Sequence, residues 1–153
     1  MALTNNISIV VKSTLTGTVG VSAVTALINQ KPTTDLTTVA TDAIYTETGT
    51  ISGGSNDIDL AGTLTDPLGN AVTFAKVMAV YIINNSTTNS ITVGGANNIP
   101  MLGSGDVMNL GLGAYNQWIN EVGIAVTAGT GDLITITGTN GETYDVVVIG
   151  SST

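Results

Sequence analysis

The sequence predicts an all-β protein, a β-sandwich or jelly roll of about eight short strands with an extended N-terminal arm. Threonine (26 residues) and glycine (19 residues) together supply 45 of the 153 residues. Threonine favours strands, and glycine supplies turns and bulges. Short alternating or apolar runs also recur between turn signals from about residue 57 onward. The sequence shows neither a heptad pattern nor an internal repeat.

Residues 1–50 are predicted to form the arm, which is partly stranded. Residues 7–11 have the composition of a strand. Residues 19–28 are apolar but interrupted by Ser22 and Thr25, so a strand and a short helix both remain open. Residues 33–50 are rich in threonine and alternate only weakly.

Residues 51–153 are predicted to form the sandwich. Residues 77–83 are nearly all apolar, which predicts a central strand buried on both faces. A turn is expected around Pro67, and Asn140-Gly141 predicts a type I′ hairpin between the two strongest strands. The expected strands are residues 57–60, 72–74, 77–83, 91–93, 107–110, 124–126, 133–137 and 144–149. Residues 101–120 are rich in glycine and leucine, with one strand expected within them.

The charge content excludes several classes of function. Only 9% of the residues are charged, against roughly 25% in typical soluble domains. Three lysines, no arginine and eleven acidic residues give a net charge of −8, which disfavours binding to nucleic acid or to an anionic membrane surface. The absence of histidine and cysteine removes the commonest general base, metal ligand and nucleophile pairs. We therefore expect no catalytic residue, no cofactor and no metal.

Individual polar residues favour structural roles over chemical ones. Asp57, Asp59 and Asp66 offer oxygens to a calcium ion, but their spacing does not match a calcium loop, and turn and strand-edge roles are favoured. Asp132 follows a Gly-Thr-Gly turn and is expected to cap it. Lys76 is expected to be an edge lysine that blocks sheet-to-sheet aggregation, rather than a partner in an isopeptide bond. No apolar run reaches the ~18 residues of a membrane span, and no secretory signal begins the sequence, which predicts synthesis and folding in a cytoplasm.

A contact surface with other subunits is predicted in the segment rich in glycine and leucine. Aromatic and methionine side chains are enriched in interface cores, and a surface poor in charge is easily desolvated. Trp118 has two interpretations, an interface anchor and a plug at the end of the sandwich. The candidate contact residues are Trp118, Tyr115, Leu110, Leu112 and Met108.

Residues 57–151, about 60% of the chain, resemble a family of small β-sandwich virion proteins of tailed bacteriophages. The resemblance lies in an ordered series of strand and turn motifs: residues 58–66, Gly69, and residues 72–77, 93–96, 125–133 and 144–150. The chain departs from the family pattern at residues 98–120, where a shorter Pro-Gly turn and a strand are expected, and residues 1–50 carry little resemblance.

The resemblance implies a structural virion protein, a capsid decoration or cement protein that stabilises the phage head through subunit contacts. Its implied partners are other copies of itself, as a homotrimer, and the major capsid protein, so its location would be the capsid surface of the virion. The arm would reach a neighbouring subunit. The alternatives are the receptor- or carbohydrate-binding head of a phage fibre and a structural subunit of the tail or neck.

Overall fold

The computed structural model describes residues 6–8, 11–19, 22–30, 33–35, 41–103 and 105–153. Within these ranges every regular element is a β-strand, which confirms the predicted all-β class. The same ranges contain no helix long and apolar enough to cross a membrane. The strands are β1 (Asn6–Ser8), β2 (Val11–Val19), β3 (Ser22–Gln30), β4 (Thr33–Asp35), β5 (Ala43–Thr50), β6 (Ser55–Asp59), β7 (Leu64–Thr65), β8 (Ala71–Val72), β9 (Lys76–Asn84), β10 (Ile91–Gly94), β11 (Val107–Leu110), β12 (Tyr115–Ala125), β13 (Leu133–Thr137) and β14 (Thr143–Ser151).

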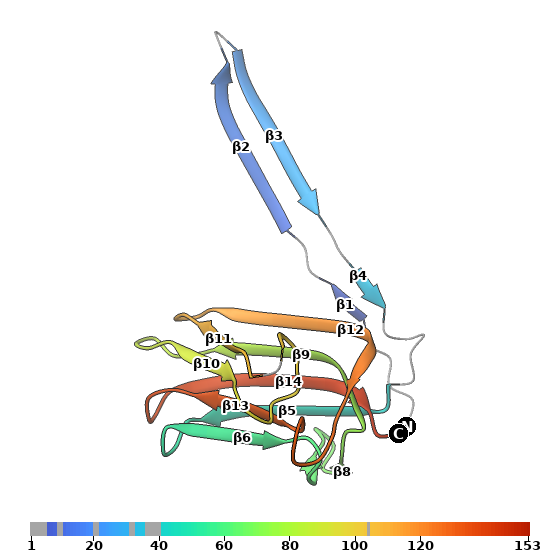
Figure 1. The fold of residues 1–153 in the computed structure, drawn as a ribbon. Coiled ribbons are helices and arrows are strands. Elements are labelled where there is room, and N and C mark those ends of the chain that lie inside the picture. The colour runs from blue at the N-terminus through green and yellow to red at the C-terminus, as the bar shows by residue number, and fades with distance from the viewer. Residues whose placement is uncertain (1–5, 9–10, 20–21, 31–32, 36–40, 104) are drawn as a thin grey trace.

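Eight of these strands form two four-stranded sheets, in the orders β11-β10-β13-β6 and β12-β9-β14-β5 (Figure 1). The antiparallel pairs are nested: β5 pairs with β14, β6 with β13, β9 with β12, and β10 with β11. This nesting is the topology of a jelly roll, a long antiparallel hairpin wound into a sandwich. The predicted sandwich of about eight strands is therefore confirmed, and the short pair β7-β8 is an addition to it.

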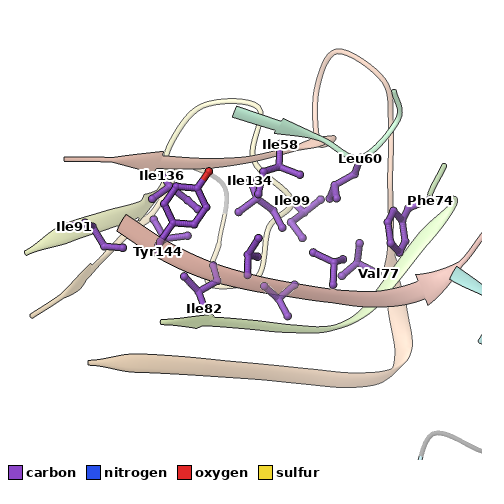
Figure 2. Close-up of a cluster of buried hydrophobic side chains, with 14 of the residues drawn as sticks. Ile58, Leu60, Phe74, Val77, Ile82, Ile91, Ile99, Ile134, Ile136 and Tyr144 are labelled. Carbon is purple, nitrogen blue, oxygen red and sulfur yellow. The ribbon is translucent and has the colours of Figure 1, made fainter. Parts of the chain in front are cut away.

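The core between the two sheets is built from the alternate, inward-facing positions of both (Figure 2). In the sheet that contains β9, Val80, Ile82 and Tyr144 are buried, and Ile134 and Ile136 face them from the other sheet. A buried aliphatic or aromatic side chain contributes roughly 1.5–3 kcal/mol to folding, so these layers hold the two sheets together. β9 lies between β12 and β14, which confirms the predicted central strand, but it is not buried on both faces over its whole length, because Tyr81 and Ile83 on its outer side are only partly buried.

The sandwich begins earlier than the predicted boundary after residue 50. β5 pairs with β14 from Ala43 to Thr50, and Ala43 lies in the core. The part of the chain that precedes the sandwich is correspondingly shorter than predicted. The inward positions of β5 include Gly49, where a Cβ atom would lie 2.2 Å from the ring of Tyr144. This strand gives a weak sequence signal because a small residue there makes room for a large one from its neighbour.

Two local predictions were wrong. β13 and β14 lie in different sheets, so Asn140-Gly141 links the two sheets and does not form a hairpin. Gly141 has a φ of 90°, but Asn140 is not among the residues with positive φ, whereas a type I′ turn needs positive φ at both positions. The second error concerns β12, which starts at Tyr115 within the segment for which the only expected strand was residues 107–110.

The strands before the sandwich form two antiparallel pairs, β1 with β4 and β2 with β3. The open choice for residues 19–28 is thus decided in favour of a strand over most of that segment, because Ser22–Gln30 is β3. The strand predicted at residues 7–11 corresponds to parts of β1 and β2, and residues 9–10 lie outside the described ranges. Figure 1 shows the β2-β3 hairpin projecting away from the sandwich.

Candidate functional site

Most aspartates singled out in the sequence stabilise turns. Asp59 accepts hydrogen bonds from the backbone N–H groups of Ala61 (3.0 Å) and Gly62 (2.9 Å). Asp66 accepts hydrogen bonds from the backbone N–H groups of Leu68 (2.8 Å) and Asn70 (2.7 Å). These bonds lower the pKa of Asp66, and those from Asn70 have the largest effect. Such bonds fix the turn that Pro67 begins, since they replace backbone partners that the turn leaves unpaired.

The remaining polar candidates also have local roles. Asp132 is buried and accepts a hydrogen bond from Gly129 N–H at 2.7 Å, which confirms the predicted turn cap. Asp57 accepts from the hydroxyl of Thr135 at 2.7 Å. Among the described residues no group of three or more histidine, cysteine, aspartate or glutamate residues is arranged to hold a metal ion.

Lys76 is exposed, but it does not lie on an edge strand. It is the first residue of β9, which is paired with β12 through Ala125 and with β14 through Ser151. The prediction that Lys76 protects a sheet edge was therefore wrong, because the apolar run that follows it occupies the middle of the sheet.

The five predicted contact residues do not form one patch. Leu110 is 4% exposed and belongs to the core, so it is not a surface anchor. Met108 and Trp118 are partly buried and pack against that core, a position that fits the interpretation of Trp118 as a plug. Tyr115 and Leu112 are exposed, at 60% and 55%. Tyr115 and Trp118 lie three residues apart in β12 and thus on opposite faces of its sheet.

These elements also build the outer face of the sheet β12-β9-β14-β5, the face turned away from the core. The strand register places twelve residues of this face in three rows, each of which crosses all four strands. Of these twelve residues, one carries a carboxylate. The rows are Tyr115, Ile83, Asp145 and Thr48; Gln117, Tyr81, Val147 and Thr46; and Ile119, Ala79, Ile149 and Ile44.

One end of this outer face is apolar and closely packed, and the other end is hollowed. Ala79 and Ile149 form a small cluster with Met78, separate from the main core. Beside the first two rows lies a shallow hollow of about 330 Å³, lined in part by Tyr81, Ile83 and Asp145.

The hollow combines aromatic and polar groups. Tyr81 lines the hollow, and its ring lies 5.8 Å between centroids, at an angle of 44°, from the ring of Tyr115, which stands outside the lining. The Thr48 hydroxyl donates to Asp145 Oδ1 at 2.6 Å, and the hydrogen bonds from Thr48 and Asn85 lower the pKa of Asp145. The carboxylate therefore stays ionised at neutral pH, fixed at one side of the hollow.

A second polar group closes the sandwich where β5 lies opposite β6. Tyr45 donates to Glu47 at 2.7 Å, and Tyr144 donates to the other oxygen of the same carboxylate at 3.4 Å. Asn56 of β6 donates to the hydroxyl of Tyr144 at 3.1 Å. The pKa of Tyr45 is raised, mainly by burial and to a smaller extent by the hydrogen bond to Glu47. The pKa of Tyr144 is also raised, again mainly by burial.

A third polar group holds the loop between β9 and β10. Glu142 accepts hydrogen bonds from the Thr88 hydroxyl at 3.1 Å and from the Asn89 side chain. Hydrogen bonds from Ser86, Asn89 and Thr88 lower the pKa of Glu142. In the tyrosine cluster the raised pKa values keep both hydroxyls protonated at neutral pH, and in the Glu142 cluster the carboxylate is held by several hydrogen bonds, so both clusters are interpreted as closures of a loop and of a sheet edge.

Comparison with known proteins adds no assignment: no family model, curated protein or solved structure matches the sequence.

The outer face of the sheet β12-β9-β14-β5 was not anticipated from the sequence, apart from Tyr115. Its signal was the alternation within β9 and β14, where Tyr81, Ile83, Asp145 and Val147 occupy every second position. That alternation was masked because the intervening positions are also apolar.

Proposed function

We propose that this protein is a non-enzymatic structural subunit that works by associating with other protein subunits. The observation that carries the proposal is the outer face of the sheet β12-β9-β14-β5, which has one carboxylate among twelve positions. Charged groups are costly to desolvate, and hydroxyl, amide and apolar groups are much less so. Such a face is suited to lie against another protein surface.

The specific form of the proposal is a capsid decoration protein of a tailed phage. The resemblance of residues 57–151 to phage virion proteins supports this form, as does the jelly-roll topology. A net charge of −8 is also compatible with a protein that stays outside the packaged DNA. Copies around a threefold axis would suit the pseudo-threefold junctions of a capsid lattice, so the association proposed is a trimer.

Self-association is tested by sedimentation equilibrium of the full chain at micromolar concentration, with Tyr115→Ser as the variant. Tyrosine buries 150–250 Å² when covered, and Tyr115 is 60% exposed, so about 2–4 kcal/mol of association depends on it at ~25 cal/mol/Å². Val107→Ser is the matched control, because Val107 is 63% exposed but lies in the other sheet. We expect the first variant to weaken association at least tenfold and the control to leave it unchanged.

Decoration itself is tested by cosedimentation of the purified protein with heads of the phage that encodes it. We expect saturable binding at a fixed number of copies per head. A chain that stays monomeric at micromolar concentration and does not sediment with the heads would contradict the proposal.

A second candidate function is glycan binding by a phage fibre head, favoured by the tyrosine pair beside Asp145. Aromatic faces contact sugar rings, and an ionised carboxylate accepts hydrogen bonds from vicinal hydroxyls. Binding of a defined oligosaccharide that is lost in both Tyr81→Ser and Tyr115→Ser would support this function over assembly.

A further inference from the structure

The free edge of β12 carries an uncharged stretch that the other strand edges of the sandwich lack. β12 ends its sheet and is paired with β9 on one side only, and Figure 1 shows it at the rim of the sandwich. Of the other three edge strands of the two sandwich sheets, β5 contains Glu47, β6 contains Asp57 and Asp59, and β11 has only four residues. Charged or short edge strands resist pairing with another chain. Residues 115–119 have neither protection.

The pairing of β12 with β9 decides which backbone groups face the free edge. The N–H of Asn84 donates to the C=O of Ala114 at 2.9 Å, next to the point where the register between the two strands begins. Hydrogen-bonded and non-hydrogen-bonded positions alternate along an antiparallel pair. The N–H and C=O groups of Tyr115, Gln117 and Ile119 therefore point away from β9. They form a row of backbone donors and acceptors along about 17 Å of the edge.

Exposed apolar side chains collect at the same edge. Three of the six most exposed large apolar side chains in the described part of the chain lie on or beside β12: Leu112 (55%), Tyr115 (60%) and Val122 (79%). Trp118 and Ile119 are only partly buried, although one packs against the main core and the other against the small cluster around Met78. An apolar edge without charge is suited to be covered by another protein surface of the same kind.

A second copy of β12 is complementary to this edge. When two copies pair antiparallel about a twofold axis at Gln117, each residue lies opposite the one that is equally distant from position 117. Gln117 then faces its own counterpart, and Tyr115 faces Ile119 of the other copy. Leu112 and Val122 each lie five residues from Gln117, so these two exposed side chains come close to each other at both ends of the contact.

The C-terminal half of β12 limits the pairing and keeps charge away from it. The register with β9 shifts between Ile119 and Ile124, and Asn120 Oδ1 accepts hydrogen bonds from the N–H groups of Val122 (3.0 Å) and Gly123 (3.2 Å). Such a bulge ends regular pairing. Glu121 lies within the bulge, and in the paired arrangement the two copies of Glu121 are about 27 Å apart, well beyond the screening length of ~8–10 Å.

We infer that residues 115–119 of β12 pair antiparallel with the same residues of a second copy, which joins two four-stranded sheets edge to edge. This inference rests on the proposed association with other subunits and names one surface that takes part in it. The contact is twofold and is separate from the proposed threefold association. Because both copies use the same edge, the pairing is closed and leaves no free β12 edge.

The first test compares full-length Gln117→Lys with full-length Asn109→Lys by sedimentation equilibrium at micromolar concentration. Asn109 is an exposed residue of the edge strand β11, so both variants place a lysine on a sheet edge and reduce the net charge of −8 by one unit. The smaller net charge favours association in general, but two lysines that face each other on the axis oppose it. We expect at least tenfold weaker association for Gln117→Lys and less than a threefold change for Asn109→Lys. Equal effects would overturn the inference, and thermal unfolding checks that both variants are folded.

The second test asks whether position 117 meets itself. Gln117→Lys is mixed with Gln117→Glu, each with a different tag, so that unlike charges face each other on the axis of the mixed pair. We expect the mixed pair to associate at least tenfold more tightly than either variant alone. The control is a mixture of Asn109→Lys and Asn109→Glu, for which no gain is expected. A mixture at position 117 that gains no more than the control would overturn the inference.

The third test uses the fluorescence of Trp118, which is the only tryptophan and lies beside Gln117. Dilution of the wild type through its dissociation range should shift the emission to longer wavelength, since the partly buried indole loses its cover. Gln117→Lys should show no shift over the same range. Dissociation of the wild type without a change in emission would place the contact elsewhere and overturn the inference.

The oligomeric state separates the inference from the proposed function. A wild-type trimer without any even-numbered species overturns the twofold pairing and leaves the assembly function standing. A dimer supports the pairing and removes only the threefold form of the proposal. A chain that stays monomeric at micromolar concentration contradicts both.

Discussion

Replacing Asn84 by alanine tests how the buried end of β9 holds the sandwich together. Asn84 is 0% exposed, and its amide nitrogen lies within hydrogen-bond distance of three backbone carbonyl oxygens, those of Asn89 (3.0 Å), Leu110 (3.1 Å) and Gly111 (2.9 Å). Its side-chain oxygen accepts from Ser86 N–H at 2.9 Å. One side chain thus connects the β9-β10 loop to the segment between β11 and β12.

The loss of free energy of unfolding follows from these partners. An intramolecular hydrogen bond contributes about 0.5–1.5 kcal/mol net, and a buried group left without a partner costs about 1–3 kcal/mol. The amide has two protons for three carbonyls, so two or three full bonds are lost in all. We expect Asn84→Ala to lower the free energy of unfolding by about 2–4 kcal/mol.

Urea denaturation followed by circular dichroism measures this change. The matched control is Asn109→Ala, at an exposed asparagine of β11, for which a change within about 0.5 kcal/mol is expected. A loss below about 1 kcal/mol for Asn84→Ala, or equal losses for both variants, would refute the reasoning that the buried amide links these loops.

Further predictions concern packing and pH. Gly49→Ala places a Cβ atom 2.2 Å from the ring of Tyr144 and should lower the free energy of unfolding by about 1–3 kcal/mol in urea denaturation; an unchanged midpoint would show that the ring moves aside freely. The pKa values of Tyr45 and Tyr144 are raised by folding, so their contribution to stability is full below pH ~10 and is lost as the pH rises further. Thermal unfolding should therefore show a falling midpoint above pH ~10, and Tyr45→Phe should reduce that fall. Folding lowers the pKa values of Glu142 and Asp145, so their contribution is full above their unfolded values near pH ~4 and is lost as the pH falls through the lower folded values. Stability measured from pH ~5 down to pH ~2 should decline less in Glu142→Gln than in the wild type, and parallel curves would contradict this role.

Much of the fold follows from local pattern. The apolar run at residues 77–83 identified β9 as a central strand, because a strand with a neighbour on each side and a core beneath it tolerates little polarity. Asp66 and Asp132 were identified as turn residues because their carboxylates reach backbone N–H groups two to four residues away, which is a property of local geometry.

The weakly patterned strands were harder to predict. β5 relies on Gly49 to receive the ring of Tyr144, and β12 contains a register shift between Ile119 and Ile124. Both strands lie at the edges of their sheet, and the burial of β5 alternates from Tyr45 to Thr50 although its sequence has few large apolar residues to signal it. Their places were decided by partners that are distant in the sequence.

By itself the sequence determined the fold class, the central strand, the turns at Pro67 and Asp132, and the scarcity of charge, since these depend on residues within a few positions of one another or on composition alone. The tertiary structure alone decided which faces are open. Leu110 and Tyr115 are five residues apart in one predicted contact segment, yet one is in the core and the other is exposed. The reason is that consecutive strands of a jelly roll alternate between its two sheets or turn back within one, so the side on which a residue lies depends on pairing with strands far along the chain.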